Sequence, residues 1–403
     1  MITRRFLLQS AAAAAAYSAE AFRAARAENA PGVTDTEIKI GQTIPYSGPA
    51  SAFGVIGRTE AAYFKMINDQ GGINGREINF ISLDDAYSPP KTVEQVRRLV
   101  EQEHVAFLAN TLGTAPNAAI RQYCNDNKVP QLFVLSGAAM FADPQHFPWT
   151  LGGIANYKTE AHIYAKHILA TKPNAKIAVL YQNDGFGKDY LIGVKDVIAP
   201  DHAGMIVKEA SYEVSEPTVD SQVVTLQGSG ADVLLIAATP KFAAQAIRKS
   251  FDLGWNAARY LTYVSQSLVT VLKPAGLDKS KGLIGATFGK DVNDPRWKDD
   301  PGVKEFEAFT TKYLSSTEFA DAGAAAGFGY GATVVQVLRQ CGNDLSRENI
   351  MRQAANLKDL ELPLLLPGIR INTSPTNYSP IHQMQLSTFN GESWELFGDV
   401  LTD

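Results

Sequence analysis

The residues whose types could do chemistry do not assemble into a catalytic or metal-binding motif. Gly185-Phe186-Gly187-Lys188 follows a β-rich run, but it lacks the spacing of a phosphate loop and the third glycine of a dinucleotide fingerprint. No GxSxG sequence occurs, so the nucleophile turn of an α/β-hydrolase is not encoded. His162 and His167 stand five residues apart, whereas paired metal ligands on one helix face stand four apart. The sequence therefore predicts no enzyme, no cofactor, no metal site and no catalytic residue.

The remaining reactive side chains have structural interpretations. Asp84-Asp85 is a carboxylate pair in sequence, yet adjacent strand residues face opposite sides of a sheet, which favours a turn at the end of a strand. Cys124 and Cys341 lie far apart and form no CxxC or Cys/His cluster. We expect both cysteines to be buried as small hydrophobic side chains.

The elements that would position a binding site alternate between strand and helix. After residues Pro89-Pro90, which favour a helix start, apolar residues recur at helical spacing at Val93, Val96 and Leu99. Short β-rich runs bounded by turn residues surround such segments and read as buried parallel strands. They occupy residues 38–44, 78–84, 105–109 and 132–135, and then 177–181, 206–210, 233–237 and 261–264. The pattern predicts two α/β lobes, each built on a doubly wound sheet.

The last hundred residues add helices and a hairpin. Helices are predicted over 303–313, 324–339 and 348–357, and strands over 383–386 and 394–397 around Asn390-Gly391. No low-complexity linker separates the two lobes. The crevice between them is therefore the expected binding site, because the carboxyl ends of both parallel sheets open there.

The first 27 residues are expected to be a cleaved export signal. Arg4-Arg5 precedes a short Ala-rich apolar stretch, and Ala25-Arg26-Ala27 fits a small-x-small cleavage site. The arginine pair favours a twin-arginine signal, and an ordinary secretory signal is the alternative. Without this segment the chain has 33 basic and 41 acidic residues, a net charge of −8. This acidic balance argues against nucleic acid as a partner, because binding to phosphate backbones needs a basic surface.

Composition fits a soluble protein of two or three domains. The 403 residues are 45% hydrophobic and 20% charged, and no apolar run reaches the 18 or more residues of a membrane span. We therefore expect no membrane insertion once the signal is removed.

Several blocks of the chain, in order, resemble periplasmic solute-binding proteins of the branched-chain amino acid (Leu/Ile/Val-binding) type ABC transporters. The first blocks are VTDTEIKIG at 33–41, Ser47-Gly48-Pro49, MINDQGGINGR at 66–76 and LDDAYSP at 83–89. The resemblance continues through KIAVLYQNDGFGKDY at 176–190 and Tyr330-Gly331-Ala332, so it covers essentially all of the chain after the signal.

This resemblance implies a bilobal type I periplasmic-binding-protein fold, a clamp that closes on a small solute and docks on a membrane permease. It implies three chain crossings between the lobes, with 35–155 plus 282–357 in lobe 1 and 156–281 plus 358–403 in lobe 2. The protein would be a periplasmic monomer. Two other classes stay open at this stage: a sensor lobe that signals to a receptor, and an exported enzyme on the same fold.

Loops that follow the predicted strands supply the candidate ligand contacts. Glycines around Phe53 allow close backbone approach, and its ring offers a flat apolar wall. Leu112 to Pro116 opens a helix whose free N–H groups and Thr114 hydroxyl are suited to a carboxylate, although Thr114 could equally cap its own helix. The resemblance implies that this loop and the Ser136 to Ala139 loop grip a ligand carboxylate, and that Phe186 adds an aromatic wall.

Two positions depart from the amino-acid binders of this family. Met140 stands where they usually place a threonine, and Gln266 stands where an acidic residue neutralises the ligand's ammonium group. A buried ammonium without a carboxylate is costly, so the departures favour a flat or apolar carboxylic acid or an amide, unless another acid such as Asp184 reaches the ligand. The predicted ligand contacts are Phe53, Thr114, Ser136, Ala138, Ala139, Met140, Phe186, Thr239 and Gln266.

Overall fold

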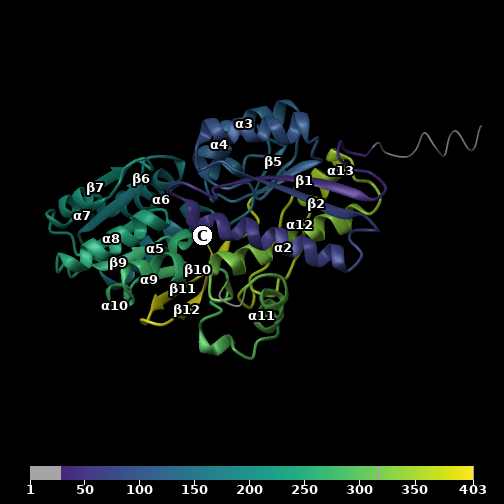
Figure 1. Cartoon of the computed structure of the whole chain (residues 1–403). Coiled ribbons are helices and arrows are strands. Elements are labelled where there is room, and N and C mark those ends of the chain that lie inside the picture. Colours follow the sequence, from purple (N-terminus) through teal and green to yellow (C-terminus); the bar gives the residue numbers. More distant parts are fainter. Residues whose placement is uncertain (1–28, 316–317, 403) are drawn as a thin grey trace, which may run out of the picture.

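A computed structural model describes residues 29–315 and 318–402, which form two α/β lobes side by side (Figure 1). The predicted export signal, residues 1–27, lies outside the described residues. Each lobe is built on one sheet, as the alternation of strands and helices predicted.

The first lobe is the five-stranded sheet β2-β1-β3-β4-β5 with the helices packed against it. All its strands pair in parallel; their bounds are β1 Glu37–Ile44, β2 Glu77–Asp84, β3 Phe107–Ala109, β4 Gln131–Val134 and β5 Thr150–Gly152. Register places Ile40 between Phe80 and Phe107. β3 and β4 are buried throughout because helices cover both faces, which is why they read as continuous apolar runs.

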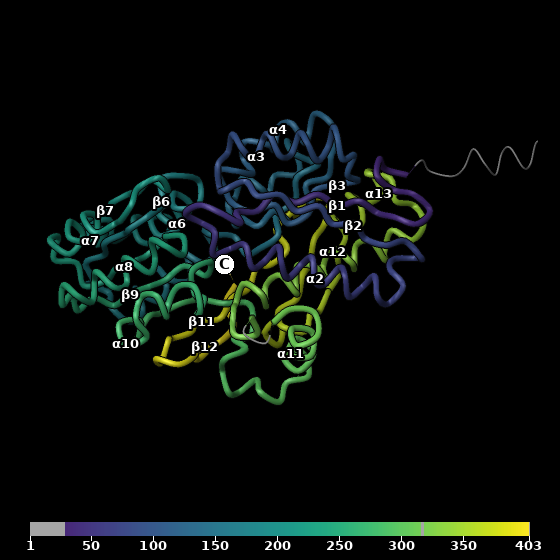
Figure 2. Tube along the Cα trace, viewed as in Figure 1, coloured from purple at the N-terminus to yellow at the C-terminus, as the bar shows by residue number. Residues whose placement is uncertain are grey.

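The second lobe is the seven-stranded sheet β12-β11-β10-β9-β8-β6-β7 with its own helices. Its strands are β6 Ile177–Gln182, β7 Ile206–Tyr212, β8 Val233–Ala237, β9 Ala258–Leu261, β10 Ile284–Thr287, β11 Gln383–Phe389 and β12 Trp394–Thr402. β11 runs antiparallel to both of its neighbours, and the other pairs are parallel. The hairpin around Asn390-Gly391 therefore extends the parallel sheet at one edge. Figure 2 shows its strands, β11 and β12, near β9 and α10.

The helices divide between the two lobes. The first lobe carries α2 Gly54–Asp69, α3 Pro89–Arg97, α4 Thr114–Asp126, α11 Pro301–Tyr313, α12 Ala322–Cys341 and α13 Arg347–Ala354. The second lobe carries α5 Tyr157–Thr171, α6 Gly185–His202, α7 Asp220–Gln227, α8 Pro240–Asp252, α9 Lys273–Ala275 and α10 Leu277–Ser280. No helix among these described residues is both long and apolar enough to cross a membrane.

Three strands differ from the expectations of the sequence. β5, at Thr150–Gly152, was not predicted. The strand predicted at 261–264 is β9 at 258–261, and Tyr263–Ser265 turns away from the sheet as a 3₁₀ helix. β10 was not predicted, and it pairs with β9 and β11 in the second lobe. The predicted boundary between residues 281 and 282 assigns this strand to the first lobe. Its pairing with β9 and β11 places it in the second lobe instead, so that chain crossing comes after Thr287. The other lobe boundaries remain predictions.

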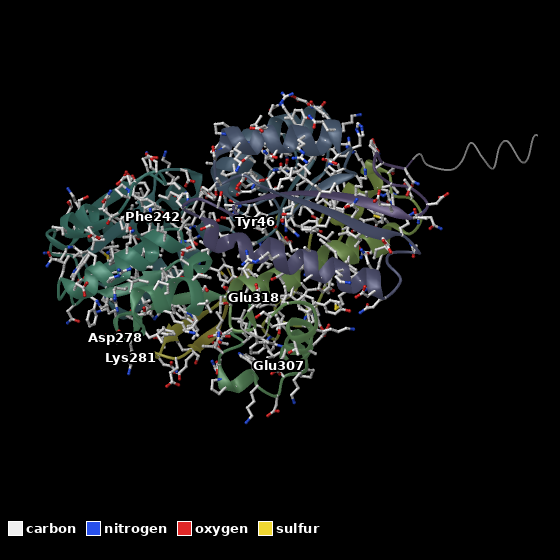
Figure 3. The ribbon with its side chains drawn as sticks, viewed as in Figure 1. Tyr46, Phe242, Asp278, Lys281, Glu307 and Glu318 are labelled. Carbon is white, nitrogen blue, oxygen red and sulfur yellow. The ribbon has the colours of Figure 1, made fainter. Side chains whose placement is uncertain are left out.

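Side chains from both lobes share one hydrophobic core. The largest buried apolar cluster runs from Ile40 in β1 through Tyr157 to Val179 in β6. Figure 3 shows Phe242 inside the second lobe and Tyr46 near the centre of the molecule, close to the start of α2. The two lobes therefore meet over packed side chains.

α2 and α12 pack closely because glycines on α12 face α2. A Cβ atom at Gly327 would lie 2.7 Å from the carbonyl oxygen of Ile56 and 2.9 Å from the Cβ of Thr59. Two residues further along α12, a Cβ at Gly329 would meet only the Cδ1 of Leu362, at an ordinary 3.8 Å. Gly327 thus sets the separation of the two helices.

Gly327→Ala should therefore destabilise the protein relative to Gly329→Ala. Both substitutions gain the same helix propensity, but only the first forces α12 away from the backbone of α2. Urea unfolding should show a free energy of unfolding lower by about 1–3 kcal/mol for Gly327→Ala than for Gly329→Ala. Equal stabilities would show that α2 does not limit the approach of α12.

Candidate functional site

A cavity of about 200 Å³ lies between the two lobes, at the carboxyl ends of strands from both sheets. From the first lobe it is lined by Tyr87 after β2 and by Leu112 in the loop after β3. From the second lobe it is lined by Phe186 after β6, Thr239 after β8 and Tyr263 after β9. This position is the one expected for a ligand site in a doubly wound fold.

Three residues on the first-lobe side of the cavity have left-handed backbone conformations. Tyr87, Asn110 and Phe133 have φ of 60°, 54° and 52° and all line the cavity. Such angles are uncommon for non-glycine residues and rarest for bulky ones. Local strain of this kind persists where surrounding packing fixes it and is typical of ligand sites.

Buried carboxylates hold the cavity wall from behind in each lobe. In the first lobe, Glu60 accepts hydrogen bonds from Gln42 Nε2 and from Asn110 Nδ2, the second at 2.5 Å. In the second lobe, Glu160 accepts from the Tyr263 backbone N–H at 2.7 Å and from the Tyr164 hydroxyl at 2.7 Å. Burial raises the pKa of Glu60 to about 8 and that of Glu160 to about 7.

The charged groups at the cavity wall are engaged with the protein itself. Lys290 is the one basic residue among the described residues that line the cavity. Its Nζ lies 2.8 Å from both carboxylate oxygens of Asp300 and 2.9 Å from the Pro363 carbonyl oxygen. Asp321 caps α12 through the Gly323 N–H at 2.8 Å. The cavity therefore presents mainly aromatic and aliphatic surface to a ligand.

Hydrogen bonds join the lobes on either side of the cavity. The Ala139 N–H of the first lobe donates to Asp189 Oδ2 of α6 at 2.8 Å. The Ser267 hydroxyl of the second lobe donates to Asp321 Oδ1 at 3.3 Å. The Tyr263 hydroxyl bonds to Tyr330 on α12. The lobes thus stand in a closed arrangement.

Four of the predicted ligand contacts line the cavity: Phe53, Phe186, Thr239 and Gln266. Phe53 ends the 3₁₀ turn before α2. Phe186 packs edge-on against Tyr157, with ring centroids 5.0 Å apart. The Thr239 hydroxyl lies 3.1 Å from Gln182 Oε1. Phe53, before α2, and Phe186, in the first turn of α6, therefore meet the same cavity from opposite lobes.

Gln266 lines the cavity, but its side chain is also tied to the sheet. Its Nε2 donates to the carbonyl oxygens of Leu261 and Ala286, each at 3.2 Å. The side chain lies directly over Gly285, where a Cβ would collide with it. This amide joins the end of β9 to β10, a structural role that the sequence did not indicate.

Five predicted contacts lie beside the cavity and do not line it: Thr114, Ser136, Ala138, Ala139 and Met140. The Thr114 and Ser136 hydroxyls lie 2.7 Å apart, and the Ala138 N–H donates to Ser136 Oγ at 3.2 Å. The Ala139 N–H is taken by Asp189, as described above. Asp189 thus occupies the Ala139 N–H, and Ser136 Oγ accepts from the Ala138 N–H, at positions that the sequence assigned to a ligand carboxylate.

Asp184 does not reach the cavity as a partner for an ammonium group. Its Oδ1 accepts from the Phe186 N–H at 3.0 Å, and its Oδ2 accepts from Gln182 Nε2 at 2.7 Å. It is the cap of α6, and burial raises its pKa. No group of three or more His, Cys, Asp or Glu side chains in the described parts of the chain is arranged to hold a metal ion.

Sequence reasoning missed several aromatic residues that line the cavity. Tyr87 and Tyr330 lie within sequence blocks that carry the family resemblance, so those blocks held a signal for them. Tyr157 follows β5, a strand that was not predicted. Tyr263 follows β9, whose predicted position was shifted by three residues. Correct strand ends would have pointed to both tyrosines.

Comparison with known proteins places this geometry in a family. The profile of a family described as "Periplasmic binding protein" matches residues 37–393. A Leu/Ile/Val-binding protein homolog 1 of Brucella suis is 27% identical over 330 residues, which cover 76% of this chain and 83% of that protein.

Two solved structures share the fold. A branched-chain amino acid ABC transporter protein from Thermus thermophilus with bound valine has a TM-score of 0.82 at 15% identity, with 92% of this chain and 98% of that chain covered. A fatty acid ABC transporter substrate-binding protein from Thermomonospora curvata has a TM-score of 0.74 at 21% identity, with 94% and 95% covered. The fold is the bilobal type I periplasmic-binding-protein fold.

Gln266→Glu should destabilise the protein, because a carboxylate would lose the Nε2 donor and face two carbonyl oxygens. We expect the free energy of unfolding to fall by about 1–3 kcal/mol at neutral pH, as for a buried hydrogen-bond partner that is removed. Gln145→Glu, at an exposed position, is the control and should change stability by less than about 0.5 kcal/mol. Equal urea midpoints for the two variants would contradict the structural role of Gln266.

Glu60→Gln should flatten the dependence of stability on pH. The folded-state pKa of Glu60 is raised above its ordinary value of 4.5 to about 8, so the folded protein binds more protons than the unfolded chain between these values. The free energy of unfolding therefore falls as pH rises through this window, by about 1 kcal/mol per pH unit from this group. Urea unfolding at pH 5, 6, 7 and 8 should show a shallower fall for Glu60→Gln. Parallel curves would mean that Glu60 is already ionised at the lower pH.

Proposed function

Because the chain belongs to the periplasmic binding protein family, we propose that it is the extracytoplasmic solute-binding component of an ABC importer. The family is exported, and we propose that this protein works in the periplasm after removal of residues 1–27. Its partners would be a small-molecule ligand and a membrane permease. It would act as a monomer.

The cavity between the two lobes is the observation that carries this proposal. Residues from the strand ends of both sheets line it, and hydrogen bonds such as Ala139 N–H to Asp189 connect the lobes beside it. A ligand held in this position contacts both lobes at once, so it stabilises the closed arrangement more than any open one. Closure would therefore follow from the ligand's difference in affinity for the two arrangements.

The cavity wall supports an uncharged or weakly polar ligand body. Phe53 and Phe186 supply aromatic surface from opposite lobes, and Lys290 is neutralised by Asp300. An α-amino acid would bring an ammonium group, and Asp184 and Gln266, the two residues considered for it, are engaged elsewhere. We propose a small carboxylic acid, amide or hydrophobic amino-acid-like ligand, with the two phenylalanines and Thr239 as contacts.

We propose binding without catalysis. The relative from Brucella suis and the protein from Thermus thermophilus are named for binding and transport. Screening with small acids, amides and amino acids by thermal shift tests this, since a ligand at 100 times its dissociation constant adds about 2.7 kcal/mol to the free energy of unfolding. A stabilising compound recovered unchanged after prolonged incubation fits a binding protein, and its conversion to product would identify an exported enzyme.

Asp189→Ala should weaken ligand binding by loosening the closed arrangement. The substitution removes the acceptor for the Ala139 N–H across the lobes, whereas Asp189→Asn keeps an oxygen in that place. We expect the apparent dissociation constant to rise about two- to ten-fold for Asp189→Ala and less for Asp189→Asn.

Small-angle scattering on the same proteins provides the structural readout. A saturating ligand should reduce the radius of gyration of the wild type, and Asp189→Ala should need more ligand for the same change. If no ligand that stabilises the protein alters its radius of gyration, lobe closure is not the mechanism.

A further inference from the structure

The cavity continues past the strand ends where the lobes meet. Beyond Tyr263 it passes Phe288, which follows β10, and reaches Leu362 and Leu364 of the segment that returns toward the second lobe. The first half of α12 forms the facing wall. We call this part, lined by Phe288, Gly329, Leu362 and Leu364, the α12 chamber.

Strand order gives the length of the cavity along the second sheet. β6, β8, β9 and β10 occupy four successive positions, and the residues that follow them, Phe186, Thr239, Tyr263 and Phe288, all line the cavity. Three strand spacings of about 4.8 Å separate the first from the last, roughly 14 Å in total. An extended chain covers only about 3.5 Å per residue, so a single amino acid is much shorter than this distance.

The α12 chamber is largely apolar, and small residues of α12 form part of its wall. On α12 the cavity touches Ala325, Ala326 and Gly329, and a Cβ at Gly329 would meet only Leu362 Cδ1, at 3.8 Å. The charged residues nearby are already paired: Lys290 with Asp300, and Asp291 with the Trp394 N–H at 2.9 Å. A ligand group that enters here meets mainly carbon atoms, and the nearby charged side chains are already hydrogen-bonded to the protein.

We infer that the ligand is an elongated molecule with a carboxylate or amide head between the strand-end loops and an aliphatic or aryl-alkyl tail in the α12 chamber. This inference rests on the proposed function and narrows it, because it assigns the far part of the cavity to the tail. A free branched-chain amino acid would fill only the part near Phe186. The small residues of α12 are then specificity determinants for tail length.

Calorimetry with a chain-length series tests the inference. The probes are hexanoate, octanoate and decanoate, the matching primary amides, and leucine as the short comparison. Within the acid series or the amide series, affinity should rise about four-fold for each methylene that becomes buried. Affinity that does not change with chain length, or the absence of binding by both series, would overturn the inference.

Variants that fill the chamber provide the second arm. Gly329→Leu should lower the affinity for the ten-carbon probe at least ten-fold and that for the six-carbon probe less than two-fold. Leu362→Phe narrows the chamber from the opposite wall and should discriminate in the same direction, which covers the case in which Gly329→Leu does not fold. Gly204→Leu, at an open position, is the control and should leave the whole series unchanged. An equal loss for short and long probes would show that the tail lies elsewhere.

The results also separate this inference from the proposed function. Tight binding of leucine with compaction, and no effect of tail length, would leave a solute-binding protein whose α12 chamber takes no ligand. Failure of every probe to bind, together with an unchanged radius of gyration in a broad solute screen, would remove the proposed function as well.

Discussion

The meeting of two parallel sheets at their carboxyl ends is the constraint on which the rest of the structure depends. Strands that end there expose backbone groups and loop side chains, and closing the lobes removes these from water. The structure pairs some of them across the interface, as with the Ala139 N–H and Asp189 or the hydroxyls of Tyr263 and Tyr330. The cavity is the space that remains between the paired groups.

Buried carboxylates make this arrangement rigid. Glu60 fixes the Asn110 side chain, and Glu160 fixes the Tyr263 backbone, so each lobe presents one positioned wall residue. Both carboxyls are fully buried and lie behind the wall, where their raised pKa reflects the cost of removing charge from water. The wall itself is mainly apolar, which is why we infer selection by shape and tail length more than by ion pairing.

Much of the fold was predictable because the signal is local. Apolar runs and turn residues located β1, β2, β6 and β8 to within a residue or two. β10 was missed because it is only four residues long and its two central positions are Gly285 and Ala286, residue types that are depleted in strands. β9 was shifted because Thr262 to Val264 is apolar enough to read as its continuation, although the chain turns there.

The site was predictable only in part, because it depends on contacts between distant segments. Local sequence places Phe53 and Phe186 shortly after strands β1 and β6, and both line the cavity. Asp189 binds the Ala139 N–H, and the Gln266 side chain lies over Gly285. Both contacts depend on the tertiary structure and leave no signal in the local sequence. Small loops such as Ser136 to Ala139 leave the backbone open to any acceptor, and here that acceptor belongs to the protein.

Hydrogen–deuterium exchange with the most stabilising solute tests most directly whether one ligand engages both lobes. We expect simultaneous protection of the segments around Tyr87 and Leu112 in the first lobe, Tyr263 in the second lobe and the start of α12. Distant surface elements such as α7 should exchange as before. Protection confined to one lobe, or none at all with a ligand that binds, would contradict a clamp that closes on its solute.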